Sequence, residues 1–170
     1  MLSKLFGRDD PLRAQAKRLV PAASIAAISS FMPLLDRYPL LRNANVKDWD
    51  FFATAAATCV GIVRLIHTVH PDRFKSLYAA ILPELHRWSP QGEDAVLDCQ
   101  KFIKLGADAN RSDGADKQFL TTDSLGMWVL WNLIQRQPSS DGGAQVAHAI
   151  GRCLVAHFHD WWASDSEQRA

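Results

Sequence analysis

Apolar residues recur at intervals of three and four along nearly every segment of this chain, and this spacing constrains its fold more than any other feature. Such a period places apolar side chains on one face of an α-helix. No segment shows the sustained alternation with β-branched residues that indicates a strand. We therefore predict an all-α protein.

Proline and aspartate divide the chain into about seven predicted helices. Aspartate favours helix N-caps, and proline favours the first helical position. On this basis Asp10, Asp72 and Asp141 are predicted caps, and Thr122 caps the sixth helix. Pro21 is predicted to break or kink the chain between the first two helices. The predicted helices span about 11–19, 22–36, 46–69, 71–88, 90–106, 122–137 and 141–163.

Two of these helices are predicted to be central and buried, around 46–70 and 122–136. The first carries a row of small residues, Ala53, Ala57 and Gly61, which lets a neighbouring helix approach closely. The second is apolar on most sides, as a helix in a core must be, and Trp128 and Trp131 are expected inside. We expect one irregular helical bundle.

The predicted bundle covers residues 9–165 of the 170-residue chain, a length typical of one domain. Residues 1–8 are predicted to be a flexible N-terminus. The polar, aperiodic segment 107–121 is predicted to be a mobile loop.

Residues 19–35 form an uncharged run, but it is shorter than the roughly 20 apolar residues of a spanning helix. We predict instead that Ile25, Ile28 and Met32, with Leu35, form the buried stripe of a helix. Attachment of residues 1–35 to a membrane surface is kept as an alternative.

The chain carries 19 basic and 18 acidic residues, so it lacks the basic excess of a nucleic-acid-binding protein. Cys59, Cys99 and Cys153 are odd in number and far apart in sequence, which argues against a disulfide framework or a zinc site. We predict a cytoplasmic protein without cofactors. Abundant alanine and arginine are common in proteins of GC-rich bacteria.

The strongest candidate site is a row of basic residues near the end of the third helix. Arg64, His67 and His70 follow one another at intervals of three, and Asp72 and Arg73 come directly afterwards. Arginine and histidine bind anions, whereas two histidines with an aspartate bind metals. The alternative is that the histidines interact with the helix dipole and Asp72 caps the next helix.

The last two helices carry further candidates. His157 falls on the predicted apolar face of the last helix, and His157 and Asn132 are expected to be buried polar residues. Trp161 and Trp162 are adjacent and point about 100° apart on a helix. One of them is therefore predicted to extend toward a partner or a second subunit.

No glycine-rich phosphate loop, nucleophile elbow or HExxH motif is present. We therefore predict a small protein-interaction module (an adaptor, regulator, chaperone or immunity-type partner) that binds another protein or itself. The alternative is a protein or enzyme that binds a small ligand, anion or metal through Arg64, His67 and His70. The second alternative is a peripheral membrane protein.

Overall fold

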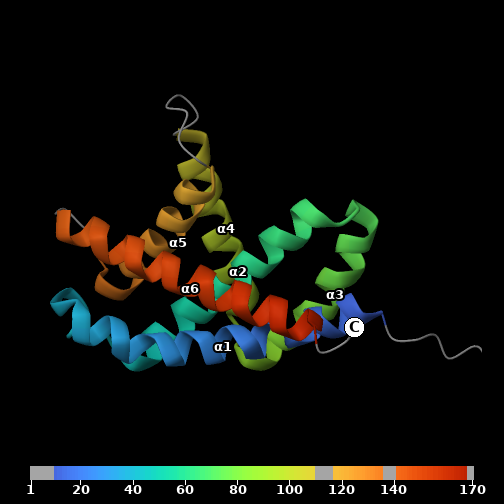
Figure 1. The fold of residues 1–170 in the computed structure, drawn as a ribbon, viewed down its shortest axis with the longest axis horizontal. Helices are drawn as coiled ribbons and strands as arrows, with labels where there is room; N and C mark the ends of the chain where they lie inside the picture. Colours follow the sequence, from blue (N-terminus) through green and yellow to red (C-terminus); the bar gives the residue numbers. More distant parts are fainter. Residues whose placement is uncertain (1–9, 110–116, 136–140, 168–170) are drawn as a thin grey trace, which may run out of the picture.

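The computed structural model describes residues 10–109, 117–135 and 141–167, and over these ranges the protein is helical without strands. This confirms the predicted all-α class, with six α-helices in place of about seven (Figure 1). Their bounds are α1 Pro11–Arg37, α2 Val46–Thr68, α3 Pro71–Trp88, α4 Gly92–Ala109, α5 Lys117–Ile134 and α6 Asp141–Glu167, with a short 3-10 helix at Pro39–Leu41.

The predicted break at Pro21 is wrong, because α1 is one helix that continues through both Pro21 and Pro33. Each proline removes a backbone donor to the carbonyl four residues earlier. Both prolines lie on the exposed side of α1, where water can hydrogen-bond the freed carbonyl. The predicted cap at Asp10 is present, since its side chain accepts from the backbone N–H of Leu12 at 3.1 Å.

The predicted buried stripe of α1 is also wrong. Ile25, Ile28 and Met32 are 70%, 61% and 56% exposed, and Leu35 is half-buried. The opposite, alanine-rich face is buried instead, and it packs against α2, α3 and α6. At its centre Trp49 of α2 is fully buried and donates its indole N–H to the carbonyl of Ala27 at 2.7 Å.

Helix α2 lies at the centre of the bundle, as the row of small residues predicted. It packs against α1, α4, α5 and α6, and Ala53, Ala57 and Gly61 are all buried. A Cβ atom on Gly61 would lie 2.4 Å from Leu19 Cδ1, so the Leu19 side chain of α1 occupies the space that an alanine methyl group would need.

Helices α5 and α6 cross with their backbones nearly touching. A Cβ atom on Gly126 would lie 1.7 Å from the carbonyl oxygen of Ala147, and one on Gly151 would lie 1.9 Å from that of Thr122. Because α5 begins at Lys117, Thr122 lies inside this helix and does not cap it as predicted. Trp131, expected in the core, is 41% exposed.

The predicted loop at 107–121 is helical wherever the structure describes it, because α4 extends to Ala109 and α5 begins at Lys117. The remainder of that loop, 110–116, and the predicted flexible N-terminus, 1–8, lie outside the described residues.

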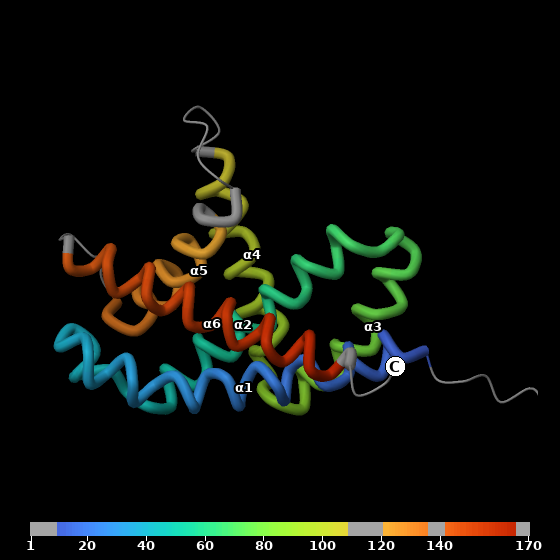
Figure 2. Tube along the Cα trace, in the orientation of Figure 1, coloured from blue at the N-terminus to red at the C-terminus, as the bar shows by residue number. Residues whose placement is uncertain are grey.

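The end of α6 returns to the beginning of α1, which Figure 2 shows as the red end of the tube beside its blue start. Gln15 donates its side-chain amide N–H to the carbonyl of Trp162 at 3.1 Å. Arg18 forms an ion pair with Asp165. These contacts between distant parts of the sequence close the bundle at this end.

By length and composition alone, α1 and α2 are each apolar enough to cross a membrane. In the folded chain 39% of the apolar window of α1 and 56% of that of α2 are buried against other helices. Burial in the core of the bundle accounts for such a composition in α2 more fully than in α1.

Candidate ligand-binding site

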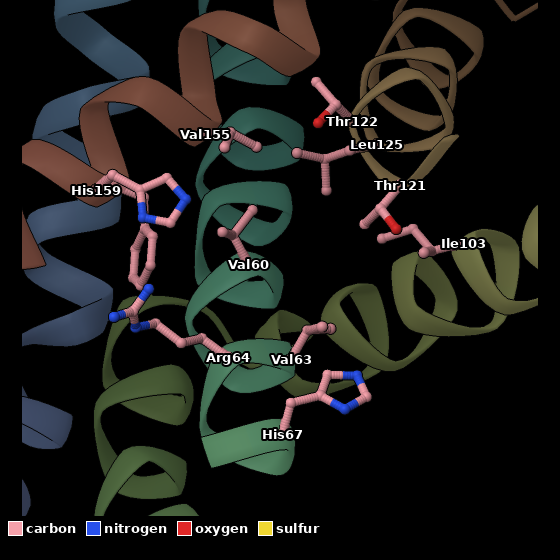
Figure 3. A pocket seen from close by; sticks show the side chains of 11 residues that line it. Val60, Val63, Arg64, His67, Ile103, Thr121, Thr122, Leu125, Val155 and His159 are labelled. Carbon is pink, nitrogen blue, oxygen red and sulfur yellow. The ribbon is translucent and has the colours of Figure 1, made fainter. Parts of the chain in front are cut away.

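A cavity of about 390 Å³ opens between α2, α4, α5 and α6 (Figure 3). All four helices contribute side chains to it, so it exists only once the bundle has formed. Its lining residues are Val60, Val63, Arg64, His67, Ile103, Thr121, Thr122, Leu125, Val155, Phe158 and His159.

The walls of the cavity are mainly apolar. Val60 and Val63 of α2 face Leu125 of α5 and Val155 of α6, as Figure 3 shows. Val60 and Val63 are three residues apart and so share one face of α2. The valines are half-buried, whereas Leu125 belongs to the fully buried core. The interior therefore suits an apolar group.

Three basic side chains stand around this apolar interior. Arg64 and His159 lie on one side of the opening, and His67 lies at another edge (Figure 3). The guanidinium of Arg64 lies over the ring of Trp162, 5.4 Å from its centroid. None of the three forms an ion pair with a carboxylate in the part of the chain that the structure describes.

The predicted basic row is divided between two places. Arg64 and His67 line the cavity, but His70 does not, because α2 ends at Thr68 and the chain turns away. His70 instead caps α3, accepting from the backbone N–H of Asp72 at 3.4 Å. The predicted cap at Asp72 is therefore wrong. Arg73 pairs with Asp10 at 3.1 Å, which ties α3 to the beginning of α1.

The row also lacks the geometry for the metal site considered as an alternative. Within residues 10–109, 117–135 and 141–167, no three histidine, cysteine or acidic side chains converge on a common point. His70 and Asp72 lie 3.8 Å apart, but both are exposed and stand away from the cavity.

The expectation that His157 is buried is wrong, because His157 is exposed. The buried face of α6 runs through Ile150, Leu154 and Phe158, and His157 lies one residue aside, about 100° around the helix. Asn132 is half-buried and donates its amide N–H to the carbonyl of Trp128 at 2.8 Å.

Trp161 and Trp162 are both half-buried and pack on the buried ring of Phe158, with centroids 6.0 and 5.4 Å away. Trp162 also supports Arg64 through the stacked guanidinium. The contact of one of these tryptophans with a partner or a second subunit remains a prediction.

His159 belongs to the site but was not among the site residues predicted from the sequence. The signal is present in α6, where Val155 and His159 are one turn apart and share a face. That signal has meaning only once Val155 is known to line a cavity.

No protein-family model, no curated protein and no solved structure matches this chain. The chemistry of the cavity is therefore the basis for a functional proposal. That chemistry combines an apolar interior with basic groups at its edge.

Proposed function

We propose that this protein binds a small amphipathic anion. The apolar body of the ligand occupies the cavity between α2, α4, α5 and α6, and its acidic headgroup lies at Arg64. The observation that carries this proposal is the combination of an apolar cavity with three basic side chains that have no acidic partner among the described residues.

The cavity supports the apolar half of the proposal. Its volume of about 390 Å³ lies within the range of roughly 300–1,000 Å³ that is usual for small-molecule sites. Transfer of an alkyl or aromatic group from water to such walls gains about 0.8 kcal/mol for each buried methylene. A ligand without an apolar body would leave the half-buried Val60 and Val155 in contact with water.

The side chain of Arg64 supports the acidic half. A guanidinium is a planar fork that binds a carboxylate or phosphate through two parallel hydrogen bonds. The ring of Trp162, 5.4 Å from the guanidinium carbon, provides a cation–π contact that holds Arg64 beside the cavity. His159, on the same side of the opening as Arg64, adds a ring nitrogen that can donate to the same headgroup, whereas His67 stands at another edge of the cavity.

The first test compares straight-chain carboxylates with primary alcohols of the same length by isothermal titration calorimetry. A hydrogen bond to a charged group contributes about 1.5–3 kcal/mol. We therefore expect each carboxylate to bind roughly 10- to 100-fold more tightly than its alcohol. Absence of binding by every carboxylate in the series would overturn the proposal.

The second test changes the site. Arg64→Gln should abolish the preference for carboxylate over alcohol, whereas the control Arg42→Gln should keep it, because Arg42 is exposed beside the 3-10 helix and does not line the cavity. Val60→Trp should fill the cavity and prevent binding of both ligands. Val63→Phe is a milder filling variant should Val60→Trp fail to fold. Unchanged binding by a folded filling variant would place the ligand elsewhere.

Protein–protein interaction, the function predicted from the sequence, has a separate supporting observation. Helix α1 exposes three large apolar side chains, at Ile25, Ile28 and Met32. A cytoplasmic location remains part of this proposal, because both a soluble ligand and a soluble partner would be met there.

A further inference from the structure

The exposed face of α1 carries a regular apolar pattern. Successive residues of this face are alternately four and three positions apart in the sequence. Their mean spacing is 3.5 residues, the repeat with which two helices pack along their whole length. All of them are exposed or half-buried in the folded chain. They are Ala14, Pro21, Ile25, Ile28, Met32 and Leu35, with one charged residue, Arg18, at the position between Ala14 and Pro21.

The central part of this face, Pro21, Ile25, Ile28 and Met32, is named the α1 seam. Helix α1 runs along one edge of the molecule (Figure 1). Its opposite face is buried against α2, α3 and α6, so no rotation of α1 within the fold can hide the seam. Burial of the seam therefore requires a partner other than the described helices of this chain.

We propose that the α1 seam packs against the α1 seam of a second copy of this chain, in antiparallel orientation about a two-fold axis. The pattern is self-complementary, as a two-fold interface requires. Centred between residues 26 and 27, Ile25 of one copy meets Ile28 of the other, and Pro21 meets Met32.

The charges at the ends of the seam favour this orientation. Lys17 lies at one end, beside Arg18, which is already paired with Asp165 of its own chain, and Asp36 lies at the other end, beside Arg37. Antiparallel pairing about the centre of the seam brings Lys17 of each copy to Asp36 of its partner, twice by symmetry. Parallel pairing would instead place the two Lys17 side chains together, which costs energy. Between these ends the run 19–35 is uncharged, so two seams meet without repulsion.

The same features favour a helix over a lipid surface as the occupant. A helix that lies in a membrane interface presents a wide apolar face with lysine and arginine on the other. In α1 the other face is already buried in the protein, so the helix cannot present the basic face that such a helix needs.

The test is the molar mass of the full chain in solution, measured by light scattering after size exclusion and by sedimentation velocity. We expect a dimer of twice the 19.0 kDa chain mass. The double variant Ile25→Glu with Ile28→Glu should raise the dissociation constant at least a hundredfold, without loss of helix content. The control Leu105→Glu should remain dimeric, because Leu105 of α4 is 69% exposed, as Ile25 is at 70%, but lies outside the seam.

Orientation is tested by cysteine cross-linking. A mixture of Pro21→Cys and Met32→Cys chains should cross-link under mild oxidation, whereas each variant alone should not.

A wild-type protein that stays monomeric, or a dimer unaffected by the double glutamate variant, would overturn the proposal. A monomer that binds phosphatidylglycerol vesicles through the same isoleucines would also overturn it, in favour of a lipid surface. Dimerisation and carboxylate binding are separate measurements, so either proposal can fail alone.

Discussion

Replacement of Gly151 by alanine tests the close crossing of α5 and α6. A Cβ atom at this position would lie 1.9 Å from the carbonyl oxygen of Thr122, whereas ordinary contact begins at 3.4 Å. The obstacle is a backbone atom inside α5, which cannot rotate away as a side chain can. The two helices would have to separate by roughly 1.5 Å at the crossing.

The expected magnitude is a balance of two effects. Alanine gains about 1 kcal/mol over glycine in a helix interior. Against this, overpacking of a tight interface costs about 1–3 kcal/mol or more. A gap of about 0.5–1 Å also removes a quarter to a half of the dispersion attraction between the atoms it separates. We expect a net loss of about 1–2 kcal/mol, which lowers the Tm of a chain of this length by about 2–8 °C.

The assay is thermal and urea unfolding, followed by circular dichroism, with Gly106→Ala as the matched control. Gly106 is also inside a helix that packs on α5, but its added Cβ atom would meet the hydroxyl oxygen of Ser124 at 2.6 Å. That side chain can change rotamer, so the control should be within about 1 kcal/mol of wild type. If Gly151→Ala is as stable as Gly106→Ala, the close crossing is wrong.

Three further predictions concern the core. Trp49→Phe should cost about 2–3 kcal/mol in urea unfolding, because it leaves a cavity and removes the hydrogen bond to Ala27; a loss below about 1 kcal/mol would contradict this. Thr58→Val should stabilise by about 1 kcal/mol, because the buried Thr58 hydroxyl has no hydrogen-bond partner in the described part of the chain; a destabilised variant would mean the hydroxyl has one. Burial, and then the neighbouring Cys59, raise the pKa of the Cys99 thiol well above its ordinary value. The folded chain therefore keeps a proton that the unfolded chain loses above about pH 8.5, and the free energy of unfolding should fall as pH rises beyond that, by up to ~1.4 kcal/mol per pH unit. In Cys99→Ala the free energy of unfolding should fall less steeply with pH. A slope equal to that of the wild type would assign the effect to other groups.

Several features of this protein follow from local sequence alone. The helical period and the cap at Asp10 depend only on neighbouring residues, and both are present in the structure. The row of Ala53, Ala57 and Gly61 marked α2 as the central helix, because small residues at helical spacing are useful only where another helix approaches. Arg64 and His67 were also identified locally, since they share one face of α2.

Other features depend on contacts between distant segments. Helix α1 is apolar on both faces, so its periodicity did not distinguish the face that packs on α2 from the one that carries Ile25 and Ile28. His159 lines the cavity because α6 packs beside it, and His70 does not because α2 ends at Thr68. Sequence by itself determined that the chain is all-helical, because hydrogen bonding and side-chain period in a helix are local. Only the tertiary structure decided which faces meet, because burial is a property of pairs of helices.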